Sequence, residues 1–464
     1  MRFTTLPFVL PALLSVACSH KEPPAVRGSG PGNPIILISI DTLRADHLGC
    51  YGYARPTSPN LDQFAREAVL FEQLVNTGGG TLPIHISMLT SLSPTVHDSW
   101  SHNRKALSEV RITLAEQLSG ADYRTAAFVD GGWLHSRFGF AQGFEVYDDA
   151  GGRFANILPK VYGWLEQNFR QQFFLFVHTY DVHSERKQLP YDAPEPYNRL
   201  FFPDYAGPFN GCRGKRCASE LFVWLDQRLA SGQLDPRRLF SKQGLEYIVA
   251  LYDGSIAYVD HQLGLFFSIL RALGIYDQCL IIVTSDHGEE FLEHGRLLHH
   301  QNYEEYARVP LLIKLPGAEP RGLRIHSLVS TLDLMPTILD LAGIEPNPEV
   351  QGRSLVPLLA VRSIEARPVL VGGGKEKLRT PEWSMLVDGN GPVELYRVDR
   401  DPLEARNLMT GRAQVARSLH RTFLRIRKDE LRIKARLADQ EEPLSPPPLP
   451  PGTEEELKAL GYVN

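Results

Sequence analysis

Short apolar runs that alternate with helix-like segments constrain the fold of this 464-residue chain more than any other feature. Such runs are typical of strands buried on both faces of a parallel sheet, and their alternation with helices indicates a sheet covered on both sides. We therefore predict an α/β fold. The predicted strands are residues 34–40, 124–129, 173–178, 280–284 and 311–315, and the predicted helices are 60–71, 112–118, 247–273 and 332–342.

The pattern changes after about residue 362. Shorter strands are predicted at 368–371, 383–387 and 393–398, followed by an Arg-rich helix whose apolar positions (Val415, Leu419, Phe423, Ile426) form one face. Such a helix either packs on the small sheet, which we expect, or touches a membrane surface. We predict a main unit at 34–361, a smaller α+β unit at 362–442 and a Pro-rich arm at 443–464, with 185–245 as an insertion over the sheet edge.

The N-terminus indicates export. Residues 1–18 combine Arg2 with an apolar stretch too short to span a bilayer, which is typical of a signal peptide. Ser15-Val16-Ala17-Cys18 is similar to a bacterial lipobox, which predicts a lipid anchor at Cys18 and a place in the cell envelope or periplasm; the alternative is a secreted protein cut near Ala17. Residues 19–33 are rich in Pro and Gly and are predicted to be a flexible tether.

Composition narrows the classes of function. The chain is 43% hydrophobic and 22% charged, which excludes a disordered chain, a coiled coil and a multi-span membrane protein. A net charge of -5 argues against a dedicated nucleic-acid binder. In an oxidising compartment, Cys212 and Cys217 form either a disulfide or two free thiols.

Polar side chains that suit a divalent cation follow three of the predicted strands. Because the carboxyl ends of parallel strands meet at one edge of a sheet, we expect these side chains to converge. An Asp after a strand often only caps a helix, but carboxylate and imidazole groups together favour metal binding. The residues concerned are Asp41; Asp286 and His287; and His178, Asp181 and His183.

A hydroxyl group lies in the segment GGGTLPIHISMLTSL, residues 78–92. Three glycines precede Thr81, and a helix-like run follows it. The backbone N–H groups at a helix N-terminus stabilise an oxyanion, and a hydroxyl beside a metal ion can become a nucleophile. The alternative is that Thr81 is only a helix cap.

Taken in order, several segments resemble the sulfatase family of the alkaline phosphatase superfamily. Besides residues 78–92, they are ILISIDTLRADHLGCYGY (36–53), FFLFVHTYDVHSE (173–185), TSDHGEEFLEHG (284–295), LLHHQNYEEYARVPLLIKLPG (297–317) and STLDLMPTILDLAGI (330–344). The resemblance implies an alkaline-phosphatase-like fold. That fold is a mostly parallel sheet between helices, with a smaller C-terminal antiparallel sheet and a helix.

The resemblance also implies roles for individual residues. Asp41, Asp286 and His287 would bind one divalent metal, with Thr81 as the nucleophile that also faces it. His85 would lie near the anionic group, and His183 would contact the substrate or assist the leaving group. A Lys or His of the family would correspond to either His299 or His300. His178 and Asp181 would lie on the substrate side, or would hold a second metal together with His183 and one of that pair.

Two departures from the family pattern affect the predicted chemistry. Familiar sulfatases have Cys or Ser at the position of Thr81 and Arg at that of His85, a signature for conversion to formylglycine. Thr cannot form that aldehyde, because its β-carbon carries a methyl group, whereas phosphodiesterases and phosphoethanolamine transferases of the superfamily use Thr. Thr42 replaces a second Asp, so fewer hard oxygen ligands remain, which favours Mn or Zn over Ca.

The sequence thus predicts an exported metal-dependent hydrolase or transferase that acts on sulfate or phosphate esters, with phosphate esters favoured. Its substrate would be a small-molecule, glycan or lipid ester. Two alternatives remain at this stage. One is a conventional sulfuric ester hydrolase that works without formylglycine, and the other is a non-catalytic binding protein that keeps the fold.

Overall fold

The computed structural model describes residues 32–184, 188–213, 216–233, 241–317, 322–389, 391–438 and 457. The predicted signal peptide with Cys18, nearly all of the tether, and the Pro-rich arm except Leu457 lie outside the described residues. Among the described helices, none has the length and apolar character needed to cross a membrane.

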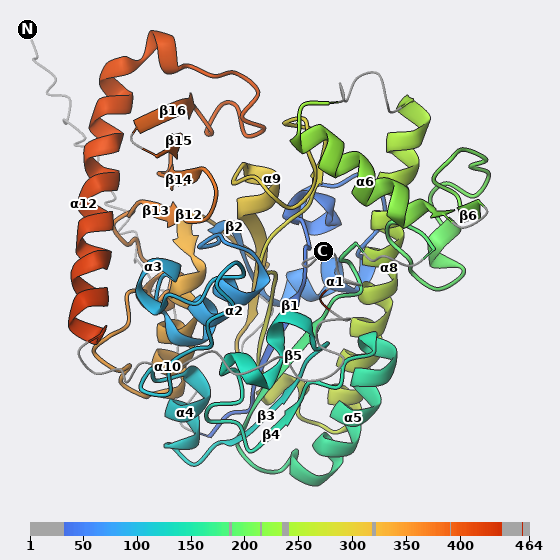
Figure 1. Ribbon diagram of the computed structural model, residues 1–464. Coiled ribbons are helices and arrows are strands. Elements are labelled where there is room, and N and C mark those ends of the chain that lie inside the picture. Colours follow the sequence, from blue (N-terminus) through green and yellow to red (C-terminus); the bar gives the residue numbers. More distant parts are fainter. Residues whose placement is uncertain are drawn as a thin grey trace, which may run out of the picture.

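An eight-stranded sheet forms the centre of the molecule, in the order β12-β2-β11-β8-β1-β5-β3-β4 (Figure 1). Strand β11 is antiparallel to both of its neighbours, and the other strand pairs are parallel. The prediction of a mostly parallel sheet is therefore confirmed. The strands are β1 (Ile35–Ile40), β2 (Val69–Val75), β3 (Arg124–Phe128), β4 (Val146–Asp148), β5 (Phe173–Thr179), β8 (Leu280–Thr284), β11 (Arg308–Lys314) and β12 (Leu323–Ser330).

The three strands that carry the predicted metal-binding residues are adjacent. Strand β1 lies between β8 and β5, and Ser39 pairs with both Thr284 and His178. Because the strands are parallel and in this register, their carboxyl ends reach the same edge of the sheet. The residues that follow β1 and β8 therefore lie next to the end of β5.

Helices cover both faces of the sheet, because alternate residues of each strand point to opposite sides. Ile36 and Ile38 of β1 contact one core, and Ile35 and Leu37 contact the other. The first core includes α1 (Pro59–Glu67), α5 (Arg153–Asn168), α6 (Ala218–Ala230) and α8 (Lys242–Ala272). The second includes α2 (Thr81–Thr90), α4 (Leu114–Ser119), α10 (Leu334–Ala342) and α11 (Val356–Leu359).

A four-stranded antiparallel sheet with a long helix follows the main unit. Its strands are β13 (Val369–Val371), β14 (Glu376–Arg379), β15 (Ser384–Asp388) and β16 (Gly391–Tyr396). Helix α12 (Ala413–Ala438) buries Ala416 and Phe423 against this sheet, as predicted. Strand β14 was not predicted, because its sequence EKLR is mostly charged.

One region differs from its prediction. The helix predicted at 60–71 ends at Glu67, and strand β2 begins at Val69, so the second half of that prediction is wrong. The spacing of the apolar residues in 60–71 fits both a helix and a strand. Only the pairing of β2 with β11 and β12 shows that the end of this segment leads into a strand. The predicted insertion contains α6 and a short hairpin, β6 (Cys212–Arg213) and β7 (Arg216–Cys217), whose two cysteines form a disulfide.

Candidate active site

A turn of three glycines places Thr81 at the start of α2. Gly78, Gly79 and Gly80 have φ angles of 75°, 91° and 92°, a region that L side chains rarely adopt. A Cβ atom on Gly78 would lie 2.2 Å from the backbone oxygen of Gly372. The segment therefore needs glycine both for its backbone conformation and for its contact with the segment after β13.

Two carboxylates and an imidazole meet beside Thr81. Potential ligand atoms of Asp41, Asp286 and His287 all lie within 4.8 Å of one another, and all three residues are buried. The Thr81 hydroxyl donates to Asp41 Oδ2 at 3.3 Å, and its Oγ1 is 3.4 Å from His287 Nε2. The structure thus brings together the predicted nucleophile and the predicted metal ligands.

This donor set fits a divalent cation. Asp41 Oδ1 and Asp286 Oδ2 are buried and have no hydrogen-bond partner among the described residues. Burial and the nearby Asp286 carboxylate raise the pKa of Asp41. A cation held by Asp41, Asp286 and His287 would offset the repulsion between the two buried carboxylates and would satisfy both orphaned oxygens.

Two further histidines lie behind this group. His85 places Nδ1 2.8 Å from the Thr81 carbonyl oxygen and Nε2 2.9 Å from Ser39 Oγ. His178 places Nε2 3.3 Å from Asp41 Oδ2. Burial lowers the pKa of both rings, so neutral imidazoles are favoured here. His85 therefore ties the first turn of α2 to β1.

A second group of side chains lies against His287. The His299 ring is 4.9 Å from that of His287 and 4.8 Å from that of His183. Burial and the neighbouring His299 lower the pKa of His183 to about 3. His300 turns away and places Nε2 3.0 Å from Asp226 Oδ2, so His299 is the member of the pair that joins the site.

Sequence reasoning missed two members of this group. His299 Nδ1 is 3.0 Å from Glu289 Oε2, and the Tyr191 hydroxyl donates to Glu289 Oε1 at 2.7 Å. Burial raises the pKa of Glu289 to about 7. The acidic pair that follows Gly288 was visible in the sequence, but nothing there distinguished Glu289 from Glu290. Tyr191 lies in the insertion, whose fold had no sequence signal.

Comparison with known proteins decides the family. The family model for sulfatases matches residues 34–344, more than half of the chain. The chain belongs to the sulfatase family.

Individual relatives agree with this assignment. Arylsulfatase K of Danio rerio is 30% identical over 195 residues, which are 39% of this chain and 37% of the relative, so the match spans little more than a third of that protein. An arylsulfatase of Clostridium perfringens is 24% identical over 439 residues, 81% of this chain and 90% of the relative. The solved phosphonate monoester hydrolase of Agrobacterium radiobacter is 22% identical, with a TM-score of 0.70 over 86% of this chain and 96% of that one, and shares the fold.

One predicted site residue of this sulfatase-family chain lies elsewhere. Asp181 Oδ2 accepts hydrogen bonds from the Phe154 N–H group at 2.9 Å and the Thr179 hydroxyl at 2.8 Å. Its carboxylate thus faces the start of α5. Asp181 caps the helix that precedes β5 in the chain, so the structure does not bring its carboxylate to the other site residues. The four residues predicted to hold a second metal are therefore not assembled.

Thr42 contributes backbone groups next to the predicted metal ligands. It has a φ of 56°, its N–H group is 3.3 Å from Asp286 Oδ1, and its carbonyl oxygen accepts from the Tyr252 hydroxyl at 2.7 Å. The backbone of Thr42 therefore fixes the orientation of Asp286, a role that does not depend on its side chain.

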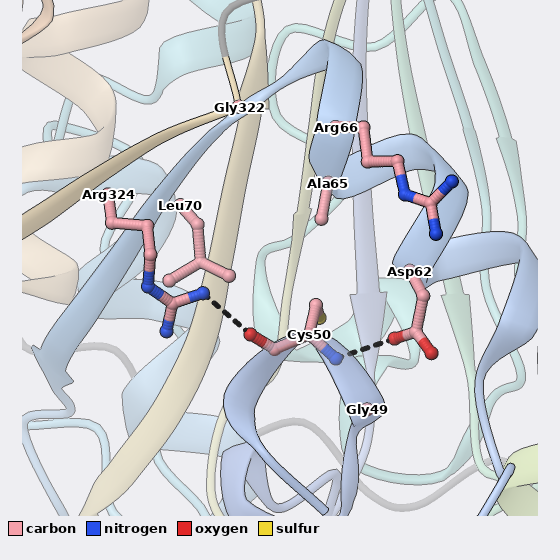
Figure 2. Close-up of a pocket in the computed structure, with 8 residues that line it drawn as sticks. All are labelled: Gly49, Cys50, Asp62, Ala65, Arg66, Leu70, Gly322 and Arg324. Atoms are coloured by element: carbon pink, nitrogen blue, oxygen red, sulfur yellow. Dashed lines mark hydrogen bonds between the residues drawn. The ribbon is translucent and has the colours of Figure 1, made fainter.

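A cavity of about 340 Å³ lies apart from this site (Figure 2). It is lined by residues of α1, β2 and β12, including Arg66 and Arg324, and by the turn that contains Cys50. Arg324 donates to the Cys50 carbonyl oxygen, and the Cys50 N–H group donates to Asp62. Burial and Asp62 raise the pKa of the Cys50 thiol to about 12, so this cavity holds no reactive thiolate at neutral pH.

Proposed function

We propose that the protein is a metal-dependent ester hydrolase in which Thr81 attacks the phosphorus or sulfur atom of its substrate. One observation carries the proposal: the Thr81 hydroxyl lies within 3.4 Å of both Asp41 Oδ2 and His287 Nε2, beside two orphaned carboxylate oxygens. A hydroxyl that served only as a helix cap would bond to the backbone of its own helix.

Each group of residues in the site would have a separate role in the reaction. Asp41, Asp286 and His287 would hold the cation, which when bound lowers the pKa of a neighbouring hydroxyl and stabilises negative charge on an ester oxygen. The N–H groups at the start of α2 stabilise the negative charge that develops near Thr81. Thr81 would pass its hydroxyl proton to Asp41, to which it already donates, and would form a covalent ester. Glu289, whose pKa burial raises to about 7, would supply a proton through His299 to the departing alkoxide, and water would then hydrolyse the Thr81 ester.

Phosphate esters are the preferred substrates in this proposal. The methyl group on the Thr81 β-carbon prevents formation of an aldehyde, so the Thr81 ester must be released by direct hydrolysis. The solved phosphonate monoester hydrolase of the same fold acts on phosphorus, which is consistent with this preference. Sulfate esters are the second candidate, because the sequence relatives are arylsulfatases.

Two assays test the proposal. With Mn²⁺ or Zn²⁺ added, an aryl phosphodiester should be cleaved at least about ten-fold faster than an aryl sulfate, a difference in barrier of about 1.4 kcal/mol. The reverse ranking would contradict the preference for phosphorus. Thr81→Ala should lower both rates about a thousand-fold or more, as removal of a nucleophile does. Thr81→Ser should keep measurable activity, because it keeps the hydroxyl.

Thr90→Ala is the matched control for these variants. Thr90 lies on the same helix, is also buried, and donates its hydroxyl to the Ile86 carbonyl oxygen away from the site. Its removal should change turnover by no more than a few fold. Equal losses in Thr81→Ala and Thr90→Ala would indicate that the helix, and not the hydroxyl, is responsible, and would favour a non-catalytic protein.

We further propose that the protein is exported and anchored by lipid at Cys18. The support is the sequence of residues 1–18 alone. The protein should incorporate a labelled fatty acid in cells, and Cys18→Ser should abolish this incorporation, which membrane contact through other surfaces does not produce. Equal labelling of the Cys18→Ser protein would contradict anchoring at this residue.

A further inference from the structure

Helix α12 has a buried face and an opposite face that the rest of the described chain leaves uncovered. The buried face repeats every seven residues, at Ala416, Phe423, Glu430 and Leu437. Phe423 contacts the small sheet, and Leu437 packs on Leu92 and Val96 of the main unit. In Figure 1 the helix runs along one edge of the molecule, with the rest of the fold on one side of it.

The opposite face combines cations with two leucines. At 100° per residue its side chains lie within an arc of about 140°, and at 1.5 Å per residue they extend over about 28 Å. We call this surface the outer face of α12. It consists of Arg417, Arg421, Leu424, Arg425, Lys428, Leu431, Arg432 and Arg436, all of them exposed.

The charge of the outer face is largely uncompensated. Arg432 pairs with Asp429 at 3.2 Å, whereas the other five cations form no ion pair with the residues that the structure describes. Helix α12 carries eight Arg and Lys residues and two acidic residues, a net charge of +6 in a chain whose total is -5. The remaining residues therefore carry -11. This separation of charge presents a positive surface to an anionic partner.

The two leucines point to the kind of partner. Leu424 and Leu431 are 52% and 51% exposed and lie seven residues apart, two turns along the same face. A purely electrostatic surface would not need them. Leucines flanked by Arg and Lys are typical of helices that lie in a membrane interface, where the apolar groups enter the headgroup layer and the long cations reach lipid phosphates.

We propose that the outer face of α12 binds the surface of an anionic lipid bilayer. The outer face of α12, about 28 Å long, lies along one side of a single helix and can therefore contact a flat surface along its length. Six cations in one cluster lie within the range that recruits proteins to anionic membranes. The proposal depends neither on the chemistry of Thr81 nor on acylation at Cys18.

Vesicle flotation tests the proposal. The full chain carrying Cys18→Ser, which cannot be acylated there, is mixed with vesicles of pure phosphatidylcholine or of phosphatidylcholine with 30% phosphatidylglycerol. We expect at least about ten-fold tighter binding to the anionic vesicles, weakened several-fold at high salt because the Debye length falls to about 3 Å at 1 M. Binding to neither kind of vesicle overturns the proposal.

Charge reversal locates the surface. Arg417→Glu/Arg421→Glu/Lys428→Glu should lower the affinity for anionic vesicles at least about ten-fold. The matched control is Arg66→Glu/Arg170→Glu/Arg228→Glu, which changes net charge equally at exposed arginines on or next to α1, α5 and α6, away from α12. The control should bind like the parent, and an equal loss in both triples would overturn the proposal. Thermal unfolding confirms that each variant is folded, and Arg→Gln and Lys→Gln versions replace any that is not.

Leucine variants separate a bilayer from other anionic partners. Leu424→Ser/Leu431→Ser should lower vesicle affinity several-fold and should remove the binding that persists at high salt. Binding of the parent to DNA or to heparin, with no binding to anionic vesicles, would replace the bilayer by a polyanion and overturn the proposal. A double Leu variant that binds vesicles like the parent would also contradict it.

Discussion

At the scale of single residues, the site depends on which of two adjacent histidines lies against His287 and His183. His299 lies against His287 and His183 and contacts Glu289, whereas His300 is directed to Asp226. His299 Nδ1 is 3.0 Å from Glu289 Oε2, and the raised pKa of Glu289, about 7, lets this pair hold a proton near neutral pH. A positioned general acid of this kind contributes a factor of about 100 or more to a rate.

His299→Gln should therefore lower kcat about 100-fold, and the adjacent His300→Gln should leave it within about three-fold. Steady-state kinetics with an ester substrate measures both. A larger loss in His300→Gln than in His299→Gln would refute this assignment of the two side chains.

The paired carboxylates predict a response to metal. Asp41 and Asp286 repel one another when both are charged, so a cation that binds the folded state stabilises it. Mn²⁺ or Zn²⁺ should raise the midpoint of thermal unfolding by several degrees, and a chelator should reverse the rise. Asp286→Asn should abolish the shift, whereas Asp260→Asn, a buried carboxylate on α8, should retain it. A shift that survives in Asp286→Asn would place the cation elsewhere.

At the scale of elements, carboxylates on one helix hold the start of another. Asp260 of α8 accepts hydrogen bonds from the N–H groups of Asn60 and Leu61 at 3.0 and 2.8 Å, and so caps α1. The side chains of Phe64 and Phe267 stack between the same two helices, with ring centroids 4.8 Å apart. The cap and the stack together fix α1 on α8.

Burial raises the pKa of Asp260 to about 6, which predicts a pH dependence. Because the folded-state pKa lies above the unfolded value, protonation favours folding, and this contribution is lost as pH rises through 6. Relative to Asp260→Asn, the wild-type free energy of unfolding should fall by up to about 3 kcal/mol between pH 4 and pH 7. Urea unfolding of both proteins measures this, and parallel pH profiles would contradict the shift.

Sequence patterns predicted some elements and not others for physical reasons. Fully buried strands such as β1 and β8 can be recognised in the sequence as continuous apolar runs. Strand β14 does not, because Lys377 is buried by ion pairs and not by apolar contacts. The convergence of Asp41, Asp286 and His287 could be predicted, because these residues lie just after the carboxyl ends of predicted parallel strands. The choice between His299 and His300 depends on the hairpin of β9 (Glu290–Phe291) and β10 (Leu297–Leu298), which the sequence does not define.

At the scale of the whole molecule, a buried ion network joins the small sheet to the main unit. Lys377 Nζ lies 2.8 Å from Glu304 Oε1 and 3.1 Å from Glu404 Oε1, and Arg379 also contacts Glu304. Although burial acts in the opposite direction, the charges of Lys377 and Arg379 lower the pKa of Glu304 to about 2. Glu304 lies on α9 (Glu304–Ala307), directly after the segment that carries His299.

Lys377→Met should destabilise the protein by about 3–5 kcal/mol, because it removes the cation that pairs with the buried Glu404 carboxylate and leaves Glu304 with Arg379 alone. Lys375→Met is the matched control. Its ammonium group pairs with Glu394 at 2.9 Å at a more exposed position, and its loss should cost less than about 1 kcal/mol. Urea unfolding at pH 7 compares the two variants. Equal losses of unfolding free energy would mean that the buried network does not stabilise the packing of the small sheet on the main unit.

The proposed function rests on covalent chemistry at Thr81, which rapid quenching of turnover tests directly. With an aryl phosphodiester as substrate, mass spectrometry of the peptide that contains Thr81 should find a phosphoryl group on that residue, absent from Thr81→Ala. A phosphoryl group on a different residue, or undiminished turnover by Thr81→Ala, would contradict the account.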